Sequence, residues 1–284
     1  MHKDEALQRF VYMMEYRNLS QNTIHMYSWY LSNFIDYCSC DDIFELTHIH
    51  AQNFIIHLKS YYAPQSLNSV ISGIRYFYDV VLDKTLSRRQ FPNILYNQKE
   101  IFVFSNNQIQ ELLNTDDVRI RAFILLGLDA GFRVGEVARL KVCDIDSKSS
   151  VKMLYIQNSK RNKSRKVPMS DTLHKALQEY WKVYRSDPNG YLFPGKGSSH
   201  INQNYINNLF KKHLRNFDFY SDEIRFHNLR DTYATLMLRN GCNIFTLKKL
   251  LGHTSFSSTA RYIKCDTSDL ELAPFISNSL RINL

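Results

Sequence analysis

Several classes of protein are excluded by what this 284-residue sequence lacks. It has no apolar run close to the roughly 20 residues that a membrane-spanning helix needs. Its first ten residues, MHKDEALQRF, are polar and include no apolar core of a secretion signal. The five cysteines, an odd number with no CxxC pair, are typical of free thiols in a reducing compartment. Together these absences predict a cytoplasmic protein.

Recognisable metal and nucleotide sites are missing as well. Cys38, Cys40, His48 and His50 lie near one another in the sequence, but their spacing matches no standard zinc site. The sequence has no GxxxxGK[ST] phosphate loop, and no Asp/Glu cluster suited to Mg²⁺ accompanies the motifs described below. We therefore expect neither a metal nor a cofactor.

Positive charge is concentrated in the second part of the chain. Residues 1–98 carry eight Lys or Arg against nine Asp or Glu, a net charge of −1, whereas residues 99–284 carry 28 against 18, a net charge of +10. The sequence pI is about 9.2. Clustered cations at this pI are typical of nucleic-acid binding, although a solvated basic hairpin would give the same composition. The surplus peaks in SKRNKSRK, which holds Lys160, Arg161, Lys163, Arg165 and Lys166.

The first 86 residues have the periodicity of a small helical bundle. In QNTIHMYSWYLSNFIDYC, residues 21–38, apolar side chains recur at the i, i+3, i+4 spacing of one helix face, and Ser20 is a good N-cap. Further helices are predicted near 3–17, near 48–61 and after Pro64, which gives a four-helix domain. Residues 87–100 have no periodicity and include a proline, so we interpret them as a linker.

Residues 101–284 mix helices with a β-hairpin. VKMLYIQ and RKVPM are short β-like runs on either side of the turn that holds Lys160. RAFILLGLDAG is apolar on all sides, which predicts a buried helix. The fold class that we expect is mainly α: a four-helix N-terminal domain, 1–86, and a mixed α+β domain, 101–284, with a small antiparallel sheet. Other helices are predicted near 171–185, 203–217, 228–240, 244–251 and 257–264.

Four segments of the second domain hold polar residues beside apolar helix faces. They are AGFRVGEVARL, SKRNKSRKVP, HNLRDTYATLM and LGHTSFSSTARY. In this order they resemble the tyrosine recombinases, the phage-integrase family. GFRVGEV is similar to the family's GLR-x-x-E-L, HNLR to its H-x-L-R, and LGH followed nine residues later by tyrosine to its last motif. LSQNTIHMYSWYLSNF also resembles the helix that helps the family's first domain to clamp DNA.

The resemblance implies site-specific DNA recombination. Strands would be cut and rejoined through a 3′-phosphotyrosyl intermediate, by four protomers that hold two DNA sites and pass through a four-way junction. Tyr262 would be the nucleophile, and Glu136 would orient Arg133. The implied catalytic residues are Arg133, Lys160, His227, Arg230, His253 and Tyr262.

The residue types fit this chemistry. A phenol has a reference pKa near ~10 and is a poor nucleophile until its proton is removed. Arg133 and Arg230 can each offer a bidentate fork to the non-bridging phosphate oxygens, which a lysine cannot do. The two histidines can donate to the same oxygens, and one of them can take the tyrosine proton. Lys160 can protonate the departing 5′ oxygen.

Two positions depart from the family pattern. Asp231 stands where many relatives have a second histidine, and Phe132 replaces the usual leucine. We expect neither position to carry the chemistry. The candidate DNA contacts are Thr23, Arg75, Arg161, Lys163, Arg165 and Lys166.

Other functions stay open. A type IB-like topoisomerase would share the nucleophile but relax DNA without a specific site, and a DNA-binding regulator would have lost the chemistry. Among recombinases, we favour a mobile-element resolvase or integrase over a chromosome-dimer resolvase. The expected partners are a double-stranded recombination site, three further copies of the chain, and an accessory protein in some systems of this kind. The tail after Asp266 is expected to dock on a neighbouring protomer, and the protein to associate with the nucleoid.

Overall fold

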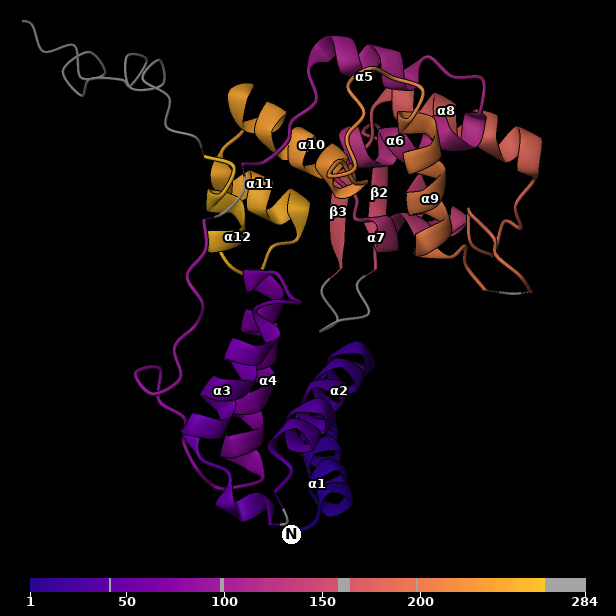
Figure 1. Ribbon diagram of the computed structural model, residues 1–284. Coiled ribbons are helices and arrows are strands. Elements are labelled where there is room, and N and C mark those ends of the chain that lie inside the picture. The colour runs from indigo at the N-terminus through magenta and orange to yellow at the C-terminus, as the bar shows by residue number, and fades with distance from the viewer. Residues whose placement is uncertain (41, 98–99, 158–163, 198, 264–284) are drawn as a thin grey trace, which may run out of the picture. The chain divides into compact units, whose positions relative to one another are not determined.

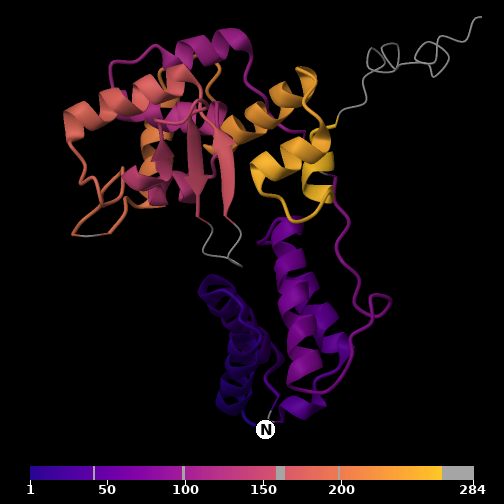
Figure 2. The same ribbon diagram turned by 180° about the vertical axis from the view of Figure 1, so that it is seen from behind.

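The computed structural model describes residues 1–40, 42–97, 100–157, 164–197 and 199–263. The chain divides into two compact units, Met1–Lys99 and Glu100–Leu284. The prediction of a mainly helical chain with one small antiparallel sheet is confirmed (Figures 1 and 2). Among the described helices, none is long and apolar enough to cross a membrane.

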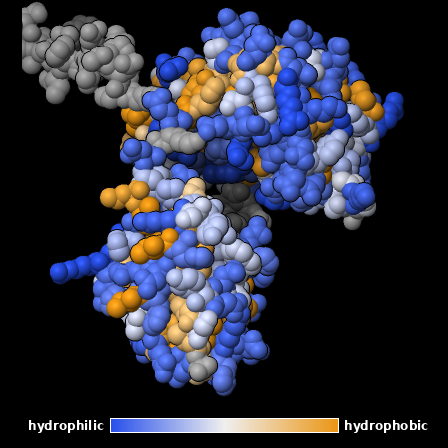
Figure 3. Space-filling view, viewed as in Figure 1, coloured by the Kyte–Doolittle hydropathy of each residue, from blue (hydrophilic) through white to orange (hydrophobic). Residues whose placement is uncertain are grey.

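The first unit is a bundle of four α-helices with a short 3-10 turn. Its core is aromatic: Phe34 packs against Phe54 and Tyr78, and the buried Tyr78 hydroxyl donates to the Thr47 carbonyl at 2.8 Å. Ser20 caps the second helix as predicted, since its side chain accepts from the Thr23 amide. Figure 3 shows separate hydrophobic patches on the visible face of this unit. The elements are α1 (Lys3–Tyr16), α2 (Gln21–Cys38), η1 (Ile43–Glu45), α3 (His48–Leu58) and α4 (Pro64–Val80).

The segment that we interpreted as the start of a linker packs on α4. Phe91 is only 2% exposed and belongs to the core of the first unit. Asn68 accepts from the Ile94 amide at 2.8 Å and donates to the Ile94 carbonyl at 3.0 Å. Arg75 donates to the Asn93 side chain at 2.9 Å and to the Phe91 carbonyl. These contacts hold residues 91–94 along α4.

The second unit is built around a buried helix. Its α6 packs against α5, α7, α8, α9 and α10, and the all-round apolar pattern seen in the sequence explains why most of its side chains are buried. The sheet has the order β1-β2-β3, with both pairs antiparallel. The helices are α5 (Asn106–Leu113), α6 (Val118–Leu128), α7 (Val134–Arg139), η2 (Val142–Asp144), α8 (Asp171–Tyr184), α9 (Gln203–Leu214), α10 (His227–Arg239), α11 (Ile244–Leu251) and α12 (Ser257–Ala260). The strands are β1 (Ile145–Asp146), β2 (Met153–Ile156) and β3 (Arg165–Pro168).

Most predicted elements are present, but several helices end early. The helices expected to reach residues 61 and 217 end at Leu58 and Leu214, and the last ends at Ala260. Strand β1 was not predicted, since two residues carry no readable alternation. The last three helices, α10, α11 and α12, lie together on one side of this unit, where α11 also contacts β3 (Figures 1 and 2).

Candidate active site

The two loop-to-helix junctions at residues 131–133 and 251–253 supply much of the site. Gly131 has φ of 64°, a left-handed conformation that glycine adopts without strain, and it turns the chain from α6 so that Arg133 becomes the N-cap of α7. Glu136, in the first turn, reaches back to accept from the Arg133 amide at 2.8 Å. Gly252, with φ of 65°, ends α11 in the same left-handed conformation and leaves the Leu251 carbonyl open to other donors.

Arg230 fills this junction from α10. Its side chain is fully buried, and its two terminal nitrogens donate to the Gly131 carbonyl at 2.5 Å and to the Leu251 carbonyl at 2.6 Å. It therefore caps the C-terminal end of α11, where carbonyls lack helical partners and a cation is favoured. Burial and the nearby charge of Arg133 lower the pKa of Arg230 to about 9.

Glu136 is the carboxylate around which the arginines gather. Arg165 of β3 makes a two-pronged ion pair with it, at 2.7 and 2.8 Å. Arg133 donates to it at 3.0 Å, and an Arg230 nitrogen lies at 3.7 Å. Burial alone would raise the pKa of Glu136, but the hydrogen bond and charge of Arg165, with smaller contributions from Arg133 and Arg230, lower it to about 2. The cluster thus holds one negative charge against three positive ones.

Arg165, one of the candidate DNA contacts, pairs with Glu136 in the structure. Its side chain is only 7% exposed and both terminal nitrogens pair with Glu136, so in this conformation they do not face a phosphate. The alternation of β3 was the missed signal, because residues 165 and 167 face inward while 166 faces solvent.

His253 faces Arg230 through one nitrogen and α12 through the other. Its Nε2 lies 3.1 Å from an Arg230 terminal nitrogen, and its Nδ1 lies 2.9 Å from the hydroxyl of the buried Thr259. A guanidinium only donates, so Nε2 accepts and Nδ1 carries the hydrogen that Thr259 accepts. Burial, followed by the charges of Arg230 and Arg133, lowers the pKa of His253 to about 4, which leaves the ring neutral at pH 7.

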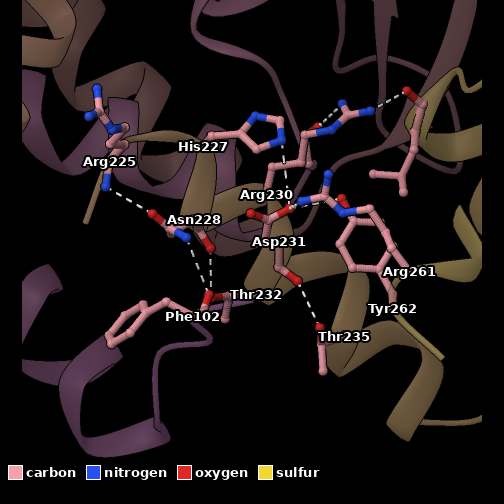
Figure 4. Close-up of polar contacts among 12 residues, drawn as sticks. Phe102, Arg225, His227, Asn228, Arg230, Asp231, Thr232, Thr235, Arg261 and Tyr262 are labelled. Atoms are coloured by element: carbon pink, nitrogen blue, oxygen red, sulfur yellow. Dashed lines mark hydrogen bonds and ion pairs between the residues drawn. The ribbon is translucent and has the colours of Figure 1, made fainter. Parts of the chain in front are cut away.

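Tyr262 follows α12 and points back towards α10. It is 5% exposed, and its hydroxyl donates to Asp231 Oδ1 at 2.8 Å (Figure 4). The same oxygen lies 3.1 Å from an Arg261 nitrogen and 3.6 Å from His227 Nε2. Burial, and then the charge of Asp231, raises the pKa of Tyr262 to about 12. Asp231 was not expected to take part in the chemistry, yet it is the hydrogen-bond partner of the tyrosine.

Five of the six residues in the implied catalytic set therefore converge. They are Arg133 at the start of α7, His227 and Arg230 in α10, His253 after α11 and Tyr262 after α12. Lys160, Arg161 and Lys163, and the tail whose docking was expected, lie outside the described residues. Of the other candidate DNA contacts, Lys166 is exposed and Arg75 is bound to residues 91–93. Thr23 takes part in the N-cap of α2. Among the described residues, no group of His, Cys, Asp and Glu could hold a metal ion.

Comparison with known proteins matches this chain to two sequence families. Residues 102–268 match the phage integrase family, and residues 6–88 match the phage integrase N-terminal SAM-like domain. The chain is 30% identical to the tyrosine recombinase XerA of Pyrococcus horikoshii over 275 residues, which cover 95% of this chain and 92% of that protein.

Two solved structures show the same fold. The crystal structure of a XerA recombinase matches with a TM-score of 0.54 at 25% identity, covering 99% of this chain and 100% of the other. The Tn1549 transposon integrase, solved in complex with transposon right end DNA, matches with a TM-score of 0.75 at 15% identity and covers 98% and 99% of the two chains.

Proposed function

This chain belongs to the phage integrase family and is a tyrosine recombinase, and from that premise we propose that it cuts and rejoins DNA at a specific site through a 3′-phosphotyrosyl intermediate. The observation that carries the proposal is the convergence of Arg133, Arg230, His253 and Tyr262 from four separate segments. XerH and lambda integrase, which share its fold, were solved bound to DNA sites. Residues 1–86 would bind DNA together with the catalytic domain, 101–284.

Each residue has a role that its position supports. Tyr262 would attack the phosphorus, and Arg133 and Arg230 would hold the two non-bridging oxygens on which charge grows. Arg133 is 39% exposed at its side chain and can reach a phosphate directly. Arg230 is fully buried, so it would exchange a main-chain carbonyl for phosphate. Glu136 would fix both arginines in place, and the neutral His253 would donate to phosphate once it turns from Thr259.

The assembly is part of the same proposal. The phosphotyrosine ester conserves the energy of the broken bond, so the 5′ hydroxyl of a second duplex can reverse the step. Four protomers on two sites would exchange strands in this way through a four-way junction, in association with the nucleoid. Among recombinases, we favour a resolvase or integrase of a mobile element.

Mapping the covalent adduct tests this function. A half-site is first selected from a random duplex library by binding to the full chain, and then placed in a nicked suicide substrate that traps the cleaved complex. We expect a DNA 3′ phosphate on Tyr262 by mass spectrometry, and no adduct with Tyr262→Phe. An adduct on another tyrosine contradicts the assignment. Relaxation of plasmids that lack the selected site would instead favour a topoisomerase.

Lys160 would supply the proton to the departing 5′ oxygen. Lys160→Ala should slow cleavage by about 10²–10⁴, the usual contribution of general acid catalysis. A sulfur at the bridging 5′ position leaves without a proton, so this substrate should restore the rate of Lys160→Ala. Lys163→Ala is the matched control and should show no such rescue. Rescue of Lys163→Ala alone would move the acid to that residue.

A further inference from the structure

Asp231 is the residue of this site for which the family resemblance gives no role. Its side chain is 5% exposed, and its Oδ1 receives the Tyr262 hydroxyl at 2.8 Å (Figure 4). Arg261 and His227 approach the same oxygen at 3.1 and 3.6 Å. A buried carboxylate needs such partners, but only one of the three, the phenol, is the reacting group of the proposed chemistry.

The histidines are poorly placed to take the tyrosine proton. Both ring nitrogens of His253 are engaged, one accepting from Arg230 and the other donating to Thr259. His227 contacts the Asp231 carboxylate at 3.6 Å, and the hydrogen bond that the structure gives the Tyr262 hydroxyl goes to that carboxylate. With a pKa of about 12, Tyr262 is phenolate in only roughly one molecule in 10⁵ at pH 7, so the attack requires a base.

We propose that Asp231 is this base: it accepts the hydroxyl proton of Tyr262 as the phenolic oxygen attacks the phosphate. The O–H bond of Tyr262 breaks and its proton passes to Asp231 Oδ1, while a bond forms between the phenolic oxygen and phosphorus. The bond from phosphorus to the 5′ oxygen breaks, and that oxygen takes a proton from Lys160. On rejoining, the carboxylic acid returns its proton to the phenolic oxygen. The inference rests on the proposed recombinase function.

Replacement of Asp231 by asparagine separates a base from a structural contact. Asp231→Asn keeps the size of the side chain and an acceptor oxygen for the phenol but removes the negative charge. Without a base, cleavage has to proceed from phenolate that forms in advance, so its rate rises about tenfold per pH unit below the pKa of the phenol. The wild type, in which the proton passes to Asp231 during the attack itself, should show a nearly flat profile over the same range.

The other titrating groups around Asp231 and Tyr262 determine the pH range in which the cleavage rates are compared. Burial lowers the pKa of both His227 and His253 below the ordinary 6.5, so both rings are predominantly neutral above pH 6.5. Arg230, with a pKa of about 9, stays charged below pH 8. The range from pH 6.5 to 8 is therefore suitable, and a 5′-bridging sulfur removes the leaving-group acid from the profile. The charged and titratable groups near Asp231 and Tyr262 are His227, Arg230, Arg261 and His253, and Arg133 acts on His227.

The experiment is single-turnover cleavage of the sulfur-containing suicide substrate by the full chain. We expect Asp231→Asn to be about 10²–10⁴ slower than wild type at pH 7 and to gain roughly 30-fold between pH 6.5 and 8. Asp144→Asn is the matched control, since Asp144 is also buried but accepts from the Lys141 backbone amide and the Gln157 side chain. It should keep the flat profile.

Three results would overturn the inference. If Asp231→Asn lowered the cleavage rate by the same factor at every pH, Asp231 would be a structural contact. A faster rate would make Asp231 a restraint on Tyr262, and an unchanged rate would show that Asp231 has no effect on cleavage. Each of these, with an adduct still on Tyr262, leaves the recombinase function intact. Absence of a wild-type adduct on Tyr262 overturns both the function and this inference.

Discussion

The two units of this chain differ in what they bury. Among the described residues of the first unit, the buried side chains are apolar or aromatic, and the ion pair of Lys3 with Asp36 lies at the surface. The second unit has a larger apolar core and also buries Glu136, Arg165, Arg230 and Asp231. Both units are mainly helical, so the difference does not come from the class of secondary structure.

Buried charge is costly, because removal from water costs several kcal/mol per ion even after relaxation. An apolar cluster of similar volume would hold α7, α10 and β3 together at lower cost. A buried ionic cluster is expected where a protein binds a charged ligand with side chains that are oriented in advance. Perturbed pKa values are concentrated at such sites. Under the proposed function, the packing around Glu136 would therefore serve phosphate binding as well as stability.

Removal of the central carboxylate gives the largest expected effect. Glu136→Ala leaves Arg165 and Arg230 buried without their ion-pair partner and should lower the free energy of unfolding by about 3–5 kcal/mol. The matched variant in the first unit, Asp36→Ala, removes an exposed pair and should cost at most about 1 kcal/mol. Urea denaturation at pH 7 measures both. Equal costs would erase the distinction between the units.

Acid should weaken the second unit more than the first. The folded-state pKa of Glu136 lies below its ordinary value of 4.5, so its stabilisation is complete above pH 4.5 and is lost as the pH falls through about 2. A pKa shift of this size corresponds to about 3 kcal/mol in the free energy of unfolding. His253 also lowers the stability of the folded state as the pH falls from 6.5, its ordinary pKa, to about 4, its folded-state pKa. Over this range the unfolded chain binds a proton at His253 more readily than the folded chain does.

The two tryptophans allow each unit to be followed separately, since Trp29 lies in α2 and Trp181 in α8. Fluorescence of Trp29→Phe reports the second unit, and that of Trp181→Phe reports the first. We expect the midpoint in urea to fall further for the Trp181 signal between pH 7 and pH 3. Parallel losses in both signals would show that the ionic cluster does not govern acid sensitivity.

Local features were predictable from the sequence. The apolar stripe of α2, its N-cap at Ser20 and the all-round apolar pattern of α6 each depend on residues within a few turns, and the structure contains all three. The catalytic candidates were found through short motifs whose spacing is itself local. Helix ends were less predictable, because a last turn such as that at residues 59–61 depends on tertiary contacts.

The pairings inside the site depend on distant residues. Arg165 and Glu136 are 29 positions apart, and Tyr262 and Asp231 are 31 apart, so no periodicity reports them. The basic run at 159–166 looks uniform in composition, yet strand alternation turns Arg165 inward and Lys166 outward. Asp231 was set aside because it departs from the family pattern, whereas the position one turn after His227 already brings it beside that histidine.

The smallest expected effect concerns the salt dependence of DNA binding, and it compares lysines proposed to contact DNA with an arginine that is buried in the protein. If about six phosphates are neutralised, the logarithm of the association constant should fall against the logarithm of salt concentration with a slope of roughly −5. Lys163→Gln combined with Lys166→Gln should flatten this slope by about 2, since each contact contributes about 0.9. Lys166 is exposed on β3, which supports its choice.

Arg165→Gln is the informative control for that measurement, because it removes one positive charge from the same hairpin. Its guanidinium is paired with Glu136, so we expect the salt slope to stay unchanged while the free energy of unfolding falls. Arg75→Gln should behave in the same way in the first unit, where the side chain binds residues 91–93. If Arg165→Gln flattened the slope as much as either lysine, Arg165 would have to leave Glu136 on binding DNA. The buried cluster would then supply an arginine to the DNA phosphates on binding, rather than keep the same pairings throughout.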